Sequence, residues 1–245
     1  LNLHCGVEEM NDASASDIPV EYAGLSAELN AGDPVLIADG LIRLVVNEAP
    51  GVPSGTVVCT VEDGGPVSAR KGVNVPGTMV DLPAIGPNDK AAIAHALKAG
   101  ADYLAVSYVR TPEDLQPAID AVKAAGKHVP VVAKIEHPMA LERLEEILDL
   151  ADAVMVARGD LGVEIPLEDV PVAQQRIIDG ALERGMIVIV ATQMLETMTL
   201  NPRPTRAEVS DISSAIRHGA TAVMLSGETA TGNYPLAAVQ TMAKI

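Results

Sequence analysis

The feature that most constrains the fold is an alternation of short apolar runs with longer amphipathic segments, which begins near residue 87. The apolar runs predict strands at 103–109, 129–135, 153–157, 186–191 and 222–225. The segments between them predict helices at about 87–99, 112–125, 138–149, 168–184 and 205–218. Successive strands lie roughly 20 to 35 residues apart, which is the spacing of βαβ units, so we predict a parallel sheet covered by helices.

Residues 1 to about 80 follow a different pattern. Runs typical of β-strands at 17–22, 34–37, 41–46 and 55–61 are separated by clusters of Gly, Pro, Asn and Asp. Asp39-Gly40 falls between two of these runs and predicts a hairpin turn. We therefore predict two domains, a small all-β, barrel-like module over residues 1–81 and an α/β domain over residues 82–245.

The chain is strongly acidic, with 33 Asp and Glu against 17 Lys and Arg and a net charge of −16. This balance argues against a nucleic-acid-binding surface. Because the sequence shows neither an apolar run long enough to span a bilayer nor a charged-then-apolar leader, we predict a cytoplasmic protein without a membrane partner. Cys5 and Cys59 are too few for a disulfide framework or a zinc cluster, so we expect buried free thiols. The chain opens on Leu1 rather than a methionine, from which we expect a fragment of a longer protein.

Every predicted strand of the α/β domain ends in, or is followed directly by, polar residues. In chain order they are Ser107 and Arg110, Lys134 and Glu136, Gly159 and Asp160, Thr192 and Gln193, and Ser226 to Thr229. Packing does not account for polar residues at all five strand ends. Ligand binding does, since parallel α/β folds bind ligands at the carboxyl ends of their strands. The sequence therefore predicts a site at that edge of the sheet.

The residue types at the second and third strand ends indicate a divalent-cation site. Side chains alternate along a strand, so Lys134 and Glu136 project from one face, and the next run ends at Asp160. Mg²⁺ and Mn²⁺ prefer one or two carboxylates, completed by water and substrate oxygens. The Lys134 ammonium is placed to balance the charge of a phosphoryl group or an enolate. The amides of Gly159 and Asp160 are placed to bind a carboxylate, and Thr192 adds a hydroxyl.

A purely structural interpretation competes with this one. In it, Lys134 only neutralises Glu136 or Asp160 as a strand-end ion pair, which is the common role of an isolated Lys-x-Glu sequence. We favour the cation site because both carboxylates end apolar strands whose neighbours also end in polar groups. His137 lies just past a strand end, and we expect it to be a solvated loop residue rather than a metal ligand.

At these residues the sequence resembles the pyruvate kinase family, whose members transfer the phosphoryl group of phosphoenolpyruvate to ADP. The motifs that carry the resemblance are AKIE at 133–136, MVARGDLGVE at 155–164, ATQMLE at 191–196, RPTRAE at 203–208 and MLSGETA at 224–230. They occur in the family's order, and the similarity extends from about residue 17 to the end. The segment KGVNVPG at 71–77 resembles the return of the chain from the family's mobile lid, the B domain, into its barrel.

The resemblance implies a partial TIM-type (β/α)8 barrel of about five βα units, preceded by the lid. It implies that Glu136 and Asp160 ligate Mg²⁺ or Mn²⁺ and that Lys134 stabilises the phosphoryl group in transfer and the enolate. It also implies that Lys134, Gly159, Asp160 and Thr192 contact phosphoenolpyruvate or pyruvate.

Three further residues receive roles from the resemblance. Lys71 would reach ADP or ATP from the lid. Ser107 and Arg110 match the end of the family's fourth barrel strand and receive supporting roles only.

Parts of the family's pattern have no counterpart in these residues. The first three barrel strands, which supply ligands for K⁺ and the phosphates, and the C-terminal domain are missing. We expect the full-length protein to need K⁺ and to form a homotetramer, and the chain alone to be weakly active or inactive. A faint match of residues 1–6 to the second-strand motif is taken as accidental.

Two other functions stay open at this stage. A Mg²⁺-dependent aldolase or lyase acting on pyruvate enolate has a similar barrel, and the lid module and Lys71 argue against it. A non-catalytic metal-binding remnant is favoured by the missing strands, and the intact Lys134, Glu136, Asp160 and Thr192 argue against it.

Overall fold

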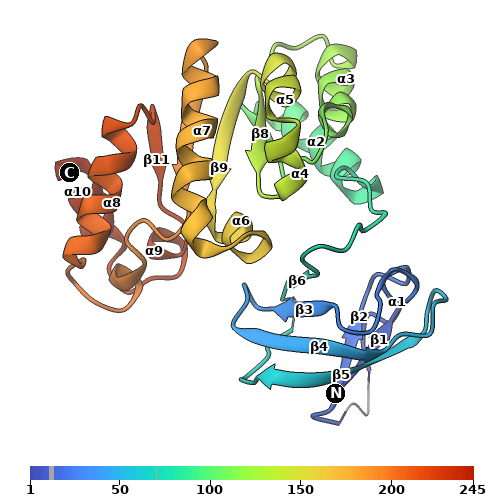
Figure 1. Ribbon diagram of the computed structural model, residues 1–245. Coiled ribbons are helices and arrows are strands. Elements are labelled where there is room, and N and C mark those ends of the chain that lie inside the picture. Colours follow the sequence, from blue (N-terminus) through green and yellow to red (C-terminus); the bar gives the residue numbers. More distant parts are fainter. Residues whose placement is uncertain (11–13, 70) are drawn as a thin grey trace. The chain divides into compact units, whose positions relative to one another are not determined.

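Two separate sheets, each formed within its own unit, give this chain a mixed α/β fold (Figure 1). The computed structural model describes residues 1–10, 14–69 and 71–245. The first unit, Leu1–Leu82, contains a curled six-stranded sheet, and the second, Pro83–Ile245, contains a five-stranded parallel sheet with helices. No helix among the described residues is both long and apolar enough to cross a lipid bilayer.

The first unit is built on one sheet with the strand order β2-β1-β5-β4-β3-β6. Its elements are β1 (Asn2–Cys5), β2 (Asp17–Val20), α1 (Leu25–Glu28), β3 (Pro34–Ile37), β4 (Ile42–Glu48), β5 (Thr56–Asp63) and β6 (Val73–Asn74). β1 and β2 pair in parallel, and the other neighbours are antiparallel. Alternate side chains point inward, so that Leu3, Leu44 and Val57 are fully buried in one core.

The sequence predicted most of this sheet. The strand at 34–37 is confirmed at both ends, and the other three predicted strands differ by about two residues at most. The hairpin turn at Asp39-Gly40 is also confirmed, because Asp39 and Gly40 have φ of 58° and 82° between β3 and β4. Cys5 and Cys59 are buried free thiols, as expected.

Three elements of this unit were missed: β1, α1 and the two-residue strand β6. β1 was not predicted, because it is short and its partner in β5 is far away in sequence, with Asn2 paired to Val58. α1 is a single helical turn, so the unit is not all-β.

The second unit has the strand order β11-β10-β9-β8-β7, with every neighbouring pair parallel. Its strands are β7 (Leu104–Val106), β8 (Val131–Ile135), β9 (Ala153–Ala157), β10 (Ile187–Ala191) and β11 (Ala222–Met224). Its α-helices are α2 (Pro87–Ala99), α3 (Gln116–Ala124), α4 (Pro138–Glu142), α5 (Leu144–Leu150), α6 (Arg158–Glu164), α7 (Val170–Glu183), α8 (Arg206–Arg217), α9 (Gly227–Ala230) and α10 (Pro235–Lys244). Short 3₁₀ helices lie at η1 (Pro112–Leu115), η2 (Leu167–Asp169) and η3 (Glu196–Thr199).

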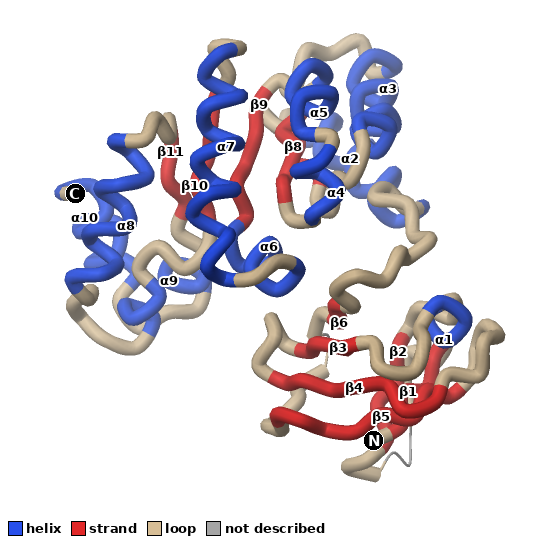
Figure 2. The backbone as a smooth tube through the Cα atoms, viewed as in Figure 1, coloured by secondary structure: helices blue, strands red, loops and turns tan. Residues whose placement is uncertain are grey.

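The two faces of this sheet carry different side chains. Ala133, Ile135 and Val154 belong to a large core shared with the helices, and Figure 2 shows α5, α7 and α8 along the strands. Val132 and Met155 belong to a small cluster on the other face. The alternation predicted along β8 is therefore confirmed.

Local signals explain where α2 begins and ends, and the predicted helix at 87–99 is confirmed at both ends. Pro87 occupies the first turn, where its missing N–H costs nothing, and Asp89 accepts a hydrogen bond from Gly86 N at 2.8 Å. Gly100 ends the helix with φ of 86°, a conformation that glycine adopts without strain.

Several other boundaries were wrong. The predicted strand at 103–109 ends at Val106, because Tyr108 has φ of 52° and cannot continue a strand. The predicted helices at 112–125 and 138–149 each divide in two, and the second break falls at Arg143, with φ of −104° and ψ of 24°. α9 and α10 were not predicted, and α6 was anticipated only as a helix turn that opens at Gly159 and Asp160.

Candidate functional site

Four neighbouring strands of the parallel sheet end at the same edge. Strand register places Val106 beside Ala133 on β8, and Ala191 beside Ala157 on β9. The residues that follow these strands therefore leave the sheet together, at the edge where parallel α/β folds bind ligands. Ser107, Glu136, Gly159 and Thr192 all lie in these continuations.

Lys134 and Glu136 contact one another at the end of β8. Lys134 Nζ lies 2.6 Å from Glu136 Oε1 and donates to Ser107 Oγ at 2.9 Å. The other carboxylate oxygen, Oε2, accepts the backbone N–H of Tyr108 at 2.7 Å. Glu136 is only 1% exposed, whereas the Lys134 side chain keeps 23% of its surface. The ion pair of the structural interpretation is thus present, with a carboxylate that is almost completely removed from water.

The backbone of Tyr108 is arranged around this carboxylate. Its φ of 52° is a left-handed conformation, which costs a residue other than glycine roughly 1–2 kcal/mol. This turn directs the Tyr108 N–H toward Glu136 Oε2. No pattern in the sequence indicates this contact, because the two residues lie 28 positions apart.

One carboxylate oxygen of Glu136 accepts no hydrogen bond. Oε1 is buried and lies within ion-pair distance of Lys134, but it has no partner in hydrogen-bond geometry. A buried carboxylate oxygen of this kind suits a hard cation. Asp160, the second predicted ligand, is partly buried in the first turn of α6, directly after β9. Among the described residues no three His, Cys, Asp or Glu side chains form a metal-binding group, so a cation here would also need oxygens from water or substrate.

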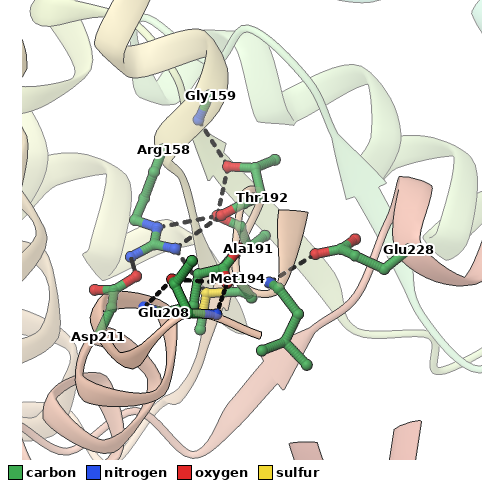
Figure 3. Close-up of polar contacts among 10 residues, drawn as sticks. Arg158, Gly159, Ala191, Thr192, Met194, Glu208, Asp211 and Glu228 are labelled. Atoms are coloured by element: carbon green, nitrogen blue, oxygen red, sulfur yellow. Dashed lines mark hydrogen bonds and ion pairs between the residues drawn. The ribbon is translucent and has the colours of Figure 1, made fainter. Parts of the chain in front are cut away.

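Thr192 lies directly after β10 and contacts the start of α6 (Figure 3). Its Oγ1 accepts the N–H of Gly159 at 2.7 Å and donates to Ala191 O at 2.5 Å. Thr192 and Gly159, two of the predicted site residues, are therefore brought together. In this structure the Gly159 amide, expected to bind a substrate carboxylate, is engaged by the threonine hydroxyl.

Arg158 was part of a quoted motif but received no role from the sequence. Its guanidinium donates to Thr192 O at 2.8 Å and forms an ion pair with Asp211 at 2.6 Å (Figure 3). Thr192 and Gln193 both have left-handed backbone, with φ of 70° and 53°. Such positions cluster at functional sites when the surrounding structure holds them in place.

Two buried or half-buried carboxylates fix the loops beside Thr192. Glu228 is 1% exposed and accepts the N–H groups of Leu195 at 2.9 Å and Ser226 at 2.8 Å. Glu208 accepts the Thr197 N–H at 2.8 Å and the Thr205 N–H at 2.7 Å. Burial would raise the pKa of Glu208, but the hydrogen bonds from Thr197 and Thr205 outweigh it and lower that pKa.

The other predicted residues lie as follows. Arg110 forms an ion pair with Asp114 at 3.7 Å, at the start of η1. His137 is not a solvated loop residue: it is half-buried and caps α4, its Nδ1 accepting Met139 N–H at 3.2 Å, because the chain turns directly from β8 into that helix. Burial lowers the pKa of His137. Lys71 is exposed in the first unit, just before β6.

Comparisons with known proteins agree with one another. The family model described as "Pyruvate kinase, barrel domain" matches residues 2–239. The pyruvate kinase of Mycobacterium tuberculosis is 49% identical over 234 residues, which are 96% of this chain and 49% of that protein. The pyruvate kinase of Corynebacterium efficiens is 46% identical over 228 residues, with 93% and 48% covered, and that of Geobacillus stearothermophilus is 47% identical over 229 residues, with 93% and 39% covered.

The chain thus spans about half the length of the curated relatives it matches, or less. The match begins at residue 2, so the sequence-based start near residue 17 was too late. Residues 2–5 form β1 of the first unit, which agrees with treating their likeness to a barrel strand as accidental.

Proposed function

Because the chain belongs to the pyruvate kinase family, we propose that the protein transfers the phosphoryl group of phosphoenolpyruvate to ADP, giving pyruvate and ATP. The observation that carries this proposal is the group at the end of β8. There the buried carboxylate of Glu136 has an oxygen, Oε1, without a hydrogen bond, and the ammonium of Lys134 lies 2.6 Å from that oxygen. A reaction that moves a phosphoryl group and leaves an enolate needs both kinds of charge at one place.

The carboxylates of Glu136 and Asp160 would hold the divalent cation, Mg²⁺ or Mn²⁺. When bound, this cation supplies positive charge that stabilises phosphoryl oxygens and an enolate oxygen. The donor set fits a hard cation, because Glu136 Oε1 is a buried carboxylate oxygen without a hydrogen bond.

The remaining roles follow from position and chemistry. Lys134, held between Glu136 and Ser107, neutralises negative charge on the phosphoryl group in transfer. The first turn of α6, with Gly159 and Asp160, binds the substrate carboxylate once the Thr192 hydroxyl releases the Gly159 amide. That hydroxyl is then available to contact substrate.

The family also supports a proposal for the architecture and assembly of the protein. Residues 82–245 form about five βα units of a TIM-type (β/α)8 barrel, and residues 1–81 form a lid whose Lys71 reaches ADP or ATP. The protein is a cytoplasmic homotetramer that uses K⁺ in addition to the divalent cation, with potassium ligands outside these residues.

Calorimetric titration of the 245-residue chain with Mn²⁺ tests the cation site without requiring turnover. Glu136→Gln and Asp160→Asn should each weaken binding at least tenfold, because each removes one anionic ligand. The exposed carboxylates Glu168 and Asp169 in η2 provide the controls, and Glu168→Gln and Asp169→Asn should leave binding unchanged. Equal affinity in all variants would remove the cation site.

Product analysis tests the reaction itself. With phosphoenolpyruvate, ADP, Mg²⁺ and K⁺, the full-length protein should form pyruvate and ATP in equal amounts. Cleavage of a 4-hydroxy-2-oxo acid without any ADP-dependent pyruvate formation would favour the aldolase or lyase interpretation instead. Mn²⁺ binding with neither reaction would favour a metal-binding remnant.

A further inference from the structure

The turn after β10 contains two consecutive strained residues. Thr192 has φ of 70° and Gln193 has φ of 53°. Neither is glycine, and Thr192 is β-branched, so both conformations are disfavoured for an isolated chain. The same turn carries the hydroxyl that the proposed function assigns to substrate. Surrounding groups must therefore hold it in place.

Arg158 makes the contacts that hold this turn (Figure 3). Its Nη2 donates to Thr192 O at 2.8 Å, and its Nε donates to Ala191 O at 3.4 Å. The next residue, Gly159, donates its N–H to the Thr192 hydroxyl at 2.7 Å. Two consecutive residues at the start of α6 thus fix both the carbonyl and the hydroxyl of Thr192.

Arg158 is itself fixed by Asp211 on α8. The Nη1–Oδ2 distance is 2.6 Å, and the Arg158 side chain is only 11% exposed. A planar guanidinium can donate to two carbonyls and a carboxylate at the same time, whereas a lysine ammonium on a flexible stem cannot reproduce that fixed fork. The arrangement joins three segments, because Thr192 lies 34 residues and Asp211 lies 53 residues from Arg158.

We propose that Arg158, anchored by Asp211, is a positioning residue that holds the left-handed turn and thereby sets the direction of the Thr192 hydroxyl. For activity this rests on the proposed function, in which that hydroxyl contacts the substrate. The role has a specific consequence for the strained turn. Glycine adopts a left-handed backbone without penalty, so with Gln193→Gly the protein should depend less on Arg158.

The experiment compares Arg158→Lys, Gln193→Gly and the double variant in the full-length protein, each with kcat and KM for phosphoenolpyruvate and with a thermal melt. The matched control is Arg184→Lys. Arg184 makes a comparable network, with Asp149 at 2.8 Å, Glu145 at 2.9 Å and the Gly180 carbonyl at 3.0 Å, but lies at the end of α7. Gln193 is exposed, so its replacement removes little packing.

We expect Arg158→Lys to lower kcat by about ten- to hundredfold, the size expected for a misplaced catalytic group. In the Gln193→Gly background the same substitution should lower kcat by about threefold or less, and Arg184→Lys should change it by less than about twofold. Asp211→Asn should reproduce part of the loss. Equal losses of kcat in both backgrounds, or a loss no larger than that of the control, would overturn the proposal.

The melting temperatures separate this inference from the proposed function. If the unsubstituted full-length protein forms no pyruvate, the proposed function fails, and the thermal data alone then decide the inference. Arg158→Lys should lower Tm more in the Gln193 protein than in the Gln193→Gly background. An equal drop would show an ordinary ion pair that does not act on the turn.

Discussion

Removing the ammonium of Lys134 should destabilise the metal-free protein far more than removing an ordinary surface lysine. The partner carboxylate of Glu136 is 1% exposed, and Lys134 Nζ lies 2.6 Å from its Oε1. Lys134→Met keeps most of the length of the side chain but leaves this carboxylate without its counter-charge. The remaining contact, from the Tyr108 N–H at 2.7 Å, does not neutralise it.

The size of the loss follows from the burial. Breaking a buried ion pair by removing one partner costs roughly 3–5 kcal/mol, and we take about 3 kcal/mol because the lysine side chain keeps 23% of its surface. For a domain of this size, about 3 kcal/mol corresponds to a fall in Tm of roughly 6–12 °C.

Thermal and urea unfolding in the presence of a chelator measure the effect. Lys123→Met is the matched control, because Lys123 is exposed on α3, and it should change the free energy of unfolding by about 0.5 kcal/mol or less. The double variant Lys134→Met/Glu136→Gln should recover part of the stability, since it leaves no uncompensated charge. The reasoning is refuted if Lys134→Met matches the control, or if the double variant is less stable than Lys134→Met alone.

Three further predictions concern other parts of the chain. Gly219→Ala should destabilise by about 1–3 kcal/mol, because φ of 110° is a backbone conformation that residues with a Cβ rarely adopt. The new Cβ would also meet the end of the exposed Leu182 side chain, which can rotate away. Gly185→Ala, at φ of 66° with open space, should cost about 1 kcal/mol, and a loss at Gly219 no larger than at Gly185 in urea unfolding would refute this. Burial raises the pKa of the Cys5 thiol, and it raises the pKa of the Cys59 thiol to about 11. Neither thiol should therefore react with Ellman's reagent at pH 8 before the first unit unfolds. Rapid labelling of the native protein would contradict this. Hydrogen bonds from His4, Ser14 and Asn2 lower the pKa of Asp17. The contribution of Asp17 to stability should therefore be present above about pH 4 and be lost as the pH drops further. Asp17→Asn should remove this part of the pH dependence, and an acid-unfolding profile unchanged by the substitution would contradict the prediction.

The sequence predicted those parts of the fold in which a periodic pattern coincides with local end signals. The helix at 87–99 was located at both ends because Pro87 and Gly100 mark them, and the strand at 153–157 because five apolar residues lie between polar neighbours. β1 is different, because its pairing depends on Val58 in a distant strand. The break at Arg143 is also non-local: its guanidinium contacts Glu113, 30 residues earlier.

The same distinction separates the two halves of the candidate site. Lys134 and Glu136 were predicted to share a face because they lie two residues apart on one strand, and the strand period decides this. The turn at Thr192 depends on contacts that cross between strands, from Arg158 and Gly159, and no period in the sequence records them. The shared face of Lys134 and Glu136 could therefore be predicted from alternation alone, whereas the contacts that hold Thr192 follow from strand register. This is why a positioning role for Arg158 could be inferred only after β9 and β10 were aligned.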